Sequence, residues 1–300
     1  AGTGKSGCLE EIILYLKQTG ILYLSVKLDK HMPRISADAY GQDLGLPESP
    51  IYCLATLSVG KPCVLIMDQL DALRWTSNHS SDALDICKEL IRQTEAINRY
   101  SEGKISIIFA SRTFDLENDK GLKELFASSD SPSALKWIKV NIDQFTKADV
   151  IQIIGQTYSY LSSRLQKLLL TPSSLYVWSK LEENAQKNSI SSVFELMNTW
   201  WQQIQQKCIS VGLQFETVIS CKDRIVGLME SRGIFSLPRV IFVDQAKEID
   251  ILVSLGLLNS NSNAKSISFT HQSFLDYFIT SDILEKIYLG YELKDLIGDR

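Results

Sequence analysis

The sequence is short of histidine and proline, and its cysteines are not spaced as metal ligands. It holds three histidines, seven prolines and six cysteines in 300 residues. No two cysteines form a C-x-x-C pair, and none stands at metal-ligand spacing from a histidine, so neither a zinc site nor a disulfide scaffold is indicated. Cys63 and Cys87 lie in apolar patterns and are expected to be buried free thiols. Buried thiols favour a reducing compartment, so we predict a cytoplasmic location.

Long apolar runs and a strong net charge are also lacking. No run approaches the roughly 18 apolar residues of a membrane span, so no membrane association is predicted. The 31 basic and 35 acidic residues leave a formal charge of −4. A charge this small gives no general attraction to nucleic acid or to anionic lipid. With 45% hydrophobic and 22% charged residues, the chain has the composition of a folded globular protein.

The first half of the chain alternates between apolar runs and helical patterns. The runs typical of buried strands are 21–28, 63–68, 105–112 and 135–142. One helical pattern runs from Ser6 to Gly20, and a short second one ends at Leu57. A third covers Ser81 to Tyr100. This alternation predicts crossover units and therefore a parallel sheet covered by helices on both faces.

Beyond Asp143 the pattern becomes mainly helical. Thr146 with Asp149, and Ser192 with Glu195, have the spacing of helix-starting capping boxes. The segment 202–300 shows two helices, a turn at Gly256, a polar Asn/Ser tip, a strand and a final helix, an order that fits a winged helix. We therefore expect three domains: an α/β domain over 1–143, a helical domain over 144–201, and over 202–300 a winged-helix domain with the start of a following segment.

The chain opens with AGTGKSG, which matches all but the first glycine of the phosphate-binding pattern G-x-x-x-x-G-K-[ST]. Glycines let backbone N–H groups converge on phosphate oxygens, and a helix N-terminus behind them favours the anion. A lysine reaches the β- and γ-phosphates, and a hydroxyl binds Mg²⁺. The predicted nucleotide contacts here are Gly2, Thr3, Gly4, Lys5, Ser6 and Gly7. The sequence is thus expected to begin inside this loop, after a first strand.

The run VLIMDQLD places two aspartates at the end of a buried strand. Asp68 is predicted to hold Mg²⁺ together with Ser6, and Asp71 to orient or deprotonate the attacking water. The alternative is a strand end with two helix-capping aspartates. The next strand ends in Arg112 at the same sheet edge, where a guanidinium can contact a γ-phosphate. Its alternative is a surface arginine paired with Asp115 or Glu117.

Two further residues stand in helical contexts. His271, in FTHQSFLDYF, precedes an amphipathic helix whose buried face carries Phe274, Leu275 and Phe278. Pro172, in LLLTPSSL, fits the first position of a helix. Either residue has an ordinary structural interpretation when it is taken alone.

Together these features resemble the STAND class of P-loop NTPases, and within it the NACHT-like signalling ATPases, over essentially the whole chain. The resemblance implies that Ser111-Arg112 ends the fourth strand of the nucleotide-binding domain and that Pro172 contacts adenine. It also implies that His271, within F-x-H-x-x-F, contacts the β-phosphate of ADP. Lys5, Asp68, Asp71 and Arg112 are then the predicted catalytic residues, and Ser6 and Asp68 the metal ligands.

The chain departs from the NACHT pattern at three positions. Gln69 stands where a small residue often follows the magnesium aspartate, and Ala72 where an acidic residue often follows the second aspartate. In the family a glycine often lies two positions before the proline, and this chain has Leu170 there. These departures favour a NACHT-like protein over a NACHT protein proper, and they leave the role of Asp71 less well defined than that of Asp68.

The resemblance implies an ATP/ADP-operated signalling switch with slow Mg²⁺-dependent ATP hydrolysis, which forms a homo-oligomer on activation and serves in immune or antiviral defence. Effector and sensor domains are expected outside this segment. Direct binding of nucleic acid is not expected, because the candidate recognition helix carries Asp244, Glu248 and Asp250. Two alternatives remain: an AAA+-like motor or loader acting on protein or nucleic acid, and a non-catalytic scaffold stabilised by nucleotide.

Overall fold

The computed structural model describes residues 2, 4–74, 80–100, 104–127, 135–186, 190–261 and 265–297. These residues form two compact units, which we call the sheet unit (5–142) and the helical unit (1–4 with 143–300). Each unit has its own hydrophobic core. No helix in the described ranges is both long enough and apolar enough to cross a membrane.

The sheet unit is built around a three-stranded parallel sheet of order β1-β2-β3. The strands are β1 (Leu22–Lys27), β2 (Cys63–Asp68) and β3 (Ile105–Phe109). The helices are α1 (Lys5–Thr19), α2 (Ala37–Asp43), α3 (Pro50–Ser58), η1 (Leu70–Arg74), α4 (Ser80–Tyr100), α5 (Thr113–Asn118) and α6 (Lys120–Leu125). The strands predicted at 21–28, 63–68 and 105–112 are therefore confirmed, as is the parallel pairing.

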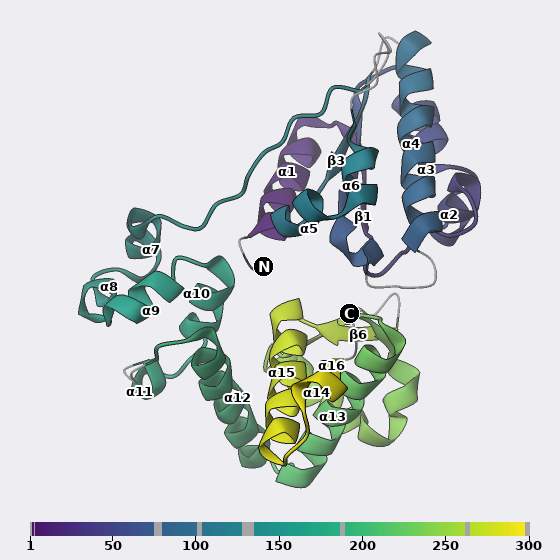
Figure 1. Ribbon diagram of the computed structural model, residues 1–300. Coiled ribbons are helices and arrows are strands. Elements are labelled where there is room, and N and C mark those ends of the chain that lie inside the picture. The colour runs from purple at the N-terminus through teal and green to yellow at the C-terminus, as the bar shows by residue number, and fades with distance from the viewer. Residues whose placement is uncertain are drawn as a thin grey trace. The chain divides into compact units, whose positions relative to one another are not determined.

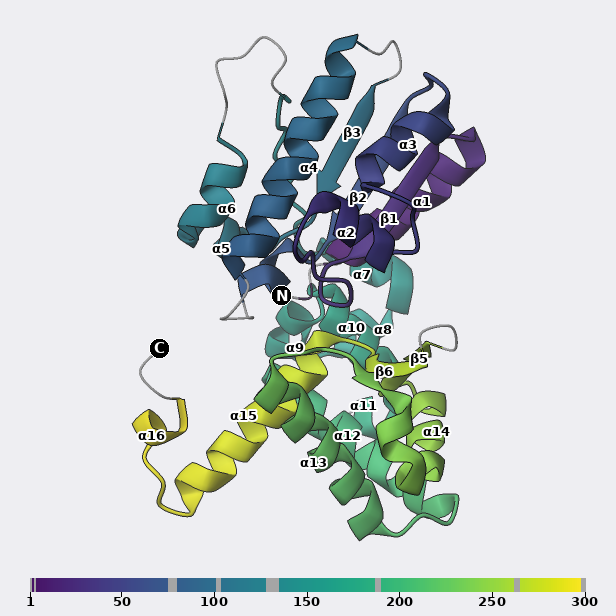
Figure 2. The same ribbon diagram turned by 90° about the vertical axis from the view of Figure 1, so that its right-hand side faces the viewer.

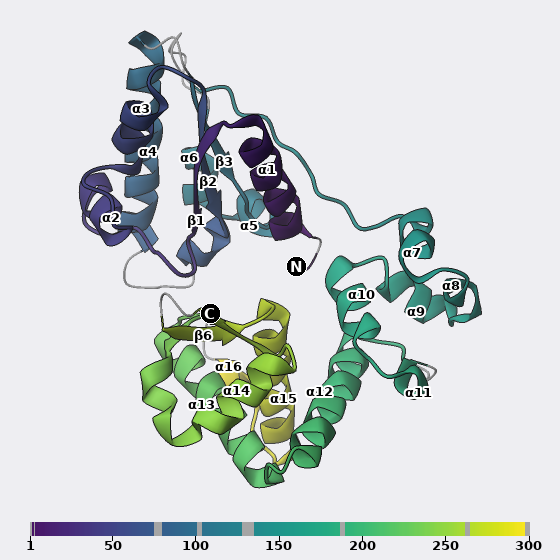
Figure 3. The same cartoon turned by 180° about the vertical axis from the view of Figure 1, so that it is seen from behind.

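Helices cover both faces of this sheet (Figures 1 and 3). Ile66 of β2 packs in the core cluster of Leu9 and Leu16 from α1. Its neighbours Leu65 and Met67 belong to the core cluster on the opposite face, which contains side chains from α3 and α4. Successive side chains of a strand point to opposite faces, so an uninterrupted apolar run such as β2 is what a doubly covered central strand requires.

The prediction of a fourth strand at 135–142 is wrong. The segment runs without strand pairing, and Ile138 and Val140 are exposed. Trp137 instead packs its ring against Phe109 and Phe126, with ring centroids 5.8 and 5.0 Å away. The segment therefore packs its Trp137 side chain against the sheet unit but makes no backbone hydrogen bonds of a sheet.

The helical unit contains helices and one small antiparallel sheet. Its helices are α7 (Lys147–Ile154), α8 (Thr157–Tyr160), α9 (Ser163–Leu168), α10 (Pro172–Ser179), α11 (Glu183–Gln186), α12 (Val193–Ser210), α13 (Phe215–Arg232), η2 (Arg239–Gln245), α14 (Ala246–Ser254), α15 (Gln272–Tyr288) and α16 (Leu293–Ile297). The sheet has the order β4-β6-β5, with β4 (Leu237–Pro238), β5 (Leu258–Asn261) and β6 (Ser266–Phe269). Figure 2 shows this sheet close to the start of α15. The predicted order of two helices, a turn at Gly256, a strand and a final helix is present.

Aromatic side chains hold the helices of this unit together. Trp200 of α12 stacks on Phe274 of α15 at a centroid distance of 4.4 Å, and Trp201 meets Phe278 edge-on at 5.0 Å. Both tryptophans are buried in the core of this unit. The capping box of Thr146 and Asp149 at the start of α7 is also confirmed. At α12 the Ser192 hydroxyl accepts from the N–H of Glu195 and caps the helix, and the Glu195 carboxylate accepts from the N–H of Ser191 at 2.7 Å.

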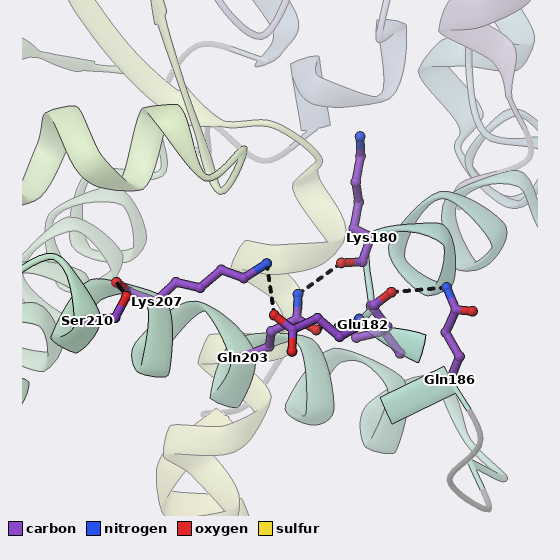
Figure 4. A network of polar contacts seen from close by, with 7 residues as sticks. Lys180, Glu182, Gln186, Gln203, Lys207 and Ser210 are labelled. Atoms are coloured by element: carbon purple, nitrogen blue, oxygen red, sulfur yellow. Dashed lines mark hydrogen bonds and ion pairs between the residues drawn. The ribbon is translucent and has the colours of Figure 1, made fainter. Parts of the chain in front are cut away.

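A polar network fixes the end of α10 against α12 (Figure 4). Gln203 of α12 accepts from the N–H of Glu182 at 2.8 Å and donates to the carbonyl of Lys180 at 2.9 Å. Gln186 donates to the carbonyls of Trp178 and Leu181 at 3.2 and 3.0 Å. The network satisfies carbonyl and N–H groups that the end of α10 leaves without helical partners.

Candidate functional site at the carboxyl edge of the parallel sheet

The hydroxyl of Ser6 and the carboxylate of Asp68 meet at the start of α1 and the end of β2. Ser6 Oγ donates to Asp68 Oδ2 at 2.9 Å, across 62 residues of sequence. Asp68 is only 4% exposed, and its Oδ1 accepts from the N–H of Gln69 at 2.9 Å. The predicted metal ligands are therefore brought together, and one carboxylate oxygen is fixed by the backbone.

These donors fit Mg²⁺, because a hydroxyl and a carboxylate oxygen are the hard ligands that this ion prefers. No group of three or more acidic, histidine or cysteine side chains that could hold a metal occurs in the described part of the chain. Mg²⁺ usually takes only one or two carboxylates and fills its other positions with phosphate oxygens and water.

The residues predicted to bind phosphate lie just before α1 and in its first turn. Lys5 and Ser6 lie in its first turn, where backbone N–H groups have no partner within the helix and favour an anion. Gly2 and Gly4 have φ values of +79° and +92°, the left-handed region that favours glycine. Gly7 lies in the same turn and is exposed. Thr3, the remaining predicted contact in the loop, lies outside the described residues.

Asp71 and Arg112 form a buried ion pair beside this site. Arg112 Nε lies 3.0 Å from Asp71 Oδ2, and the N–H of Arg112 donates to Asp71 Oδ1 at 3.2 Å. Asp71 follows β2 in η1, and Arg112 follows β3, so the parallel strands deliver both to one sheet edge. Burial raises the pKa of Asp71, while Arg112 acts in the opposite direction. Glu117, one of the two alternative partners of Arg112, pairs with Lys139 at 3.0 Å.

One carboxylate at this edge escaped the sequence analysis. Asp29 follows β1, whose end pairs with the end of β2 through Lys27 and Asp68. Its Oδ1 atom is buried and has no hydrogen-bond partner. Burial raises the pKa of Asp29; the charges of Lys30 and Lys27 lower it, and that of Asp68 raises it by a smaller effect. In the sequence Asp29 is the first acidic residue after the strand predicted at 21–28, but no motif marks it.

Pro172 and His271 lie in the helical unit, close to one α10 side chain. Pro172 begins α10, as its structural interpretation predicted. His271 immediately precedes α15, and its ring meets that of Tyr176, one turn after Pro172, at a centroid distance of 4.9 Å. Burial lowers the pKa of His271, so the neutral imidazole is favoured. Gly2 reaches the same helix start, where the N–H of Ser173 donates to the Gly2 carbonyl at 3.1 Å.

No family model matches this chain, and no curated protein matches it. Similar solved structures include the ORC2 protein of Aeropyrum pernix in its ADPNP–ADP complexes, which is 12% identical over 93% of this chain and 83% of that chain, with a TM-score of 0.44. Its ADP form is 11% identical over 94% and 85%, with a TM-score of 0.36. Drosophila ORC bound to DNA is 13% identical over 92% and 78%, with a TM-score of 0.28.

These likenesses are too distant to assign this chain to a family or to give it an activity. They do not bear out the STAND and NACHT-like resemblance. They also do not test the expectation that nucleic acid is not bound.

Proposed function

We propose that this chain is a Mg²⁺-dependent P-loop NTPase that binds ATP and ADP at the carboxyl edge of its parallel sheet. The observation that carries the proposal is the 2.9 Å contact between Ser6 and Asp68, which joins the start of α1 to the end of β2. A hydroxyl directly after a phosphate-loop lysine, in contact with a carboxylate at a strand end, is the arrangement that a magnesium–nucleotide site needs.

Each residue of the edge has a role in this proposal. The Lys5 ammonium and the N–H groups at the start of α1 bind the β- and γ-phosphates. Ser6 and Asp68 would hold Mg²⁺, which when bound neutralises charge on the phosphate oxygens. Asp71 orients the attacking water, and Arg112 stabilises the negative charge that develops on the γ-phosphate. Arg112 is held by Asp71 in this structure, so the γ-phosphate competes with Asp71 for the guanidinium.

The favoured use of this chemistry is a switch of the STAND, NACHT-like kind. Its domains are then the nucleotide-binding domain over 1–143, a helical domain over 144–201 and a winged helix over 202–300. Pro172 contacts adenine, and His271 contacts the β-phosphate of ADP and holds the closed state. Exchange for ATP releases His271 and permits homo-oligomerisation, with slow hydrolysis as the reset, because only a differential contact with the two nucleotides shifts a conformational equilibrium. Defence signalling is the setting that this class implies.

The second candidate is an AAA+-like motor or loader that acts on protein or nucleic acid. The contact between Ser6 and Asp68 serves sustained turnover as well as it serves a switch, so the site leaves both candidates open. The candidates for an arginine that reaches a neighbouring subunit are Arg92 and Arg99 on α4 and Arg164 on α9, all exposed, and no sequence pattern selects one of them. Fast turnover stimulated by a substrate supports this candidate. Tightly retained ADP that His271→Ala releases supports the switch.

Titration of the protein with ATP in the presence of Mg²⁺ tests the common proposal. Lys5→Ala removes charge-assisted hydrogen bonds to phosphate and is expected to weaken binding about 10- to 100-fold. Lys17→Ala is the matched control, because Lys17 is exposed in the last turn of the same helix. Equal affinity of the Lys5→Ala variant, the Lys17→Ala variant and the unmodified protein would contradict a phosphate loop at α1.

A further inference from the structure

Asp29 lies at the same edge of the sheet as the predicted magnesium ligands. The backbone pairing of β1 with β2 runs to Lys27 and Asp68, and the N–H of Leu28 then donates to the carbonyl of Asp68 at 3.0 Å. Asp29 is therefore the residue next to Leu28, whose backbone is hydrogen-bonded to that of Asp68. Burial raises the pKa of Asp29, Lys30 and Lys27 lower it, and the negative charge of Asp68 raises it by a smaller effect.

Against the effect of burial, the positive charges of Lys30 and Lys27 and the backbone N–H of Asp29 lower the pKa of the Asp29 carboxylate, but its Oδ1 atom accepts no hydrogen bond. The turn around it is closed by backbone bonds, in which the N–H groups of Lys30 and His31 donate to the carbonyl of Lys27 at 3.1 and 3.0 Å. Asp29 Oδ1 is buried without any hydrogen-bond partner. A buried carboxylate oxygen that is left unsatisfied destabilises the folded state, so its presence calls for a ligand that satisfies it.

We propose that Asp29 is a third carboxylate of the nucleotide site, which accepts a hydrogen bond from a water molecule bound to the Mg²⁺ ion that Ser6 and Asp68 hold. The inference rests on the proposed function. Mg²⁺ releases its water reluctantly and usually keeps several water ligands, and a carboxylate beyond the metal's direct ligands orients them. Asp29 is thus a positioning residue, since it acts on the metal through water.

The test is the Mg²⁺ dependence of nucleotide affinity in Asp29→Asn. ADP binding is measured at a series of Mg²⁺ concentrations and in EDTA. The loss of a carboxylate that orients metal-bound water is expected to raise the Mg²⁺ concentration that gives the half-maximal effect about 10-fold, while the affinity in EDTA stays that of the unmodified protein. Asp43→Asn is the matched control, because Asp43 is an exposed carboxylate of the same unit, at the end of α2.

Thermal unfolding without metal separates this role from a structural one. Because the Asp29→Asn substitution removes an unsatisfied buried charge, the metal-free variant is expected to unfold at the same temperature as the unmodified protein or at a higher one. A lower unfolding temperature would indicate a structural carboxylate and would overturn the inference. So would an unchanged Mg²⁺ dependence. Asp29→Ser gives the same comparison with a smaller side chain if the asparagine variant does not fold.

Failure of this inference differs from failure of the proposed function. If the unmodified protein binds Mg²⁺–ADP and Lys5→Ala does not, while Asp29→Asn keeps the normal Mg²⁺ dependence, only the role of Asp29 is wrong. If the unmodified protein binds no nucleotide at any Mg²⁺ concentration, the proposed function and this inference are both wrong.

Discussion

The ion pair of Asp71 and Arg112 shows how single residues organise the edge of the sheet. Arg112 is held twice by one carboxylate, through its Nε atom and through its backbone N–H. The Asp71 side chain is 8% exposed and that of Arg112 24% exposed, so little water screens the pair. The pair therefore fixes where β3 ends relative to η1, in addition to any role in chemistry.

Arg112→Ala is expected to lower the free energy of unfolding by about 2–4 kcal/mol, because it leaves Asp71 buried without its cation. Urea denaturation at pH 7 measures the loss. The loss should shrink toward pH 4, where Asp71 takes up a proton and no longer needs a partner. Lys139→Ala is the control, since the pair of Lys139 with Glu117 is exposed and should contribute less than about 1 kcal/mol. Equal losses in the two variants would contradict the buried pair.

His271 predicts a pH dependence of stability in the helical unit. Burial lowers the pKa of His271 in the folded state, so the unfolded chain binds the proton more readily. The resulting stability is fully present above the unfolded pKa of about 6.5 and is lost as the pH falls through that value. Denaturation of the unmodified protein and of His271→Gln, between pH 7.5 and pH 5.5, measures the effect. The variant should lose less stability on acidification, whereas His31→Gln, at an exposed turn, should behave as the unmodified protein. A loss in His271→Gln as large as that of the unmodified protein would rule out His271 as the source.

At the scale of elements, the strands that were predicted correctly are those whose apolar pattern fits only a buried strand. The uninterrupted run of β2 needs helices on both faces, and the sheet unit provides them. The run at 135–142 has the alternating pattern of a strand but packs Trp137 on Phe109 and Phe126 instead. The sequence of this segment does not distinguish a strand that pairs with a neighbouring strand from an extended segment that only packs a side chain against aromatic rings.

The same reasoning explains which site residues the sequence predicted. Ser6 belongs to the predicted phosphate loop and Asp68 to the end of a buried strand, two sequence patterns that a magnesium–nucleotide site requires. The structure brings the two residues into contact. Asp29 belongs to no such pattern, and its importance depends on burial and on strand register, which exist only once the chain is folded. The contact between His271 and Tyr176 likewise joins residues that are far apart in sequence and carry no shared motif.

Gln203 gives a prediction about how α10 is held against α12. Its side chain is 8% exposed and satisfies two backbone groups at the end of α10, the N–H of Glu182 and the carbonyl of Lys180. Gln203→Leu leaves both groups unpaired and is expected to cost about 2–3 kcal/mol of unfolding free energy. Gln202→Leu makes the same change at the exposed neighbouring position and should stay within about 0.5 kcal/mol. If the two variants prove equally stable in urea, the network is not what holds this helix end.

At the scale of the whole molecule, the chain divides its predicted functions between two units with separate cores. The sheet unit carries Ser6, Asp68, Asp71 and Arg112, and the helical unit carries Pro172 and His271. A switch needs this division, because the nucleotide must contact a part of the chain that can move as well as the part that binds phosphate.

The most direct measurement is a crystal structure of the protein with Mg²⁺ and a non-hydrolysable ATP analogue. We predict that the β- and γ-phosphates lie at the start of α1 against Lys5, and that the metal lies between Ser6 Oγ and the Asp68 carboxylate. An analogue bound elsewhere on the chain, or an empty carboxyl edge of the parallel sheet at saturating analogue, would contradict the account.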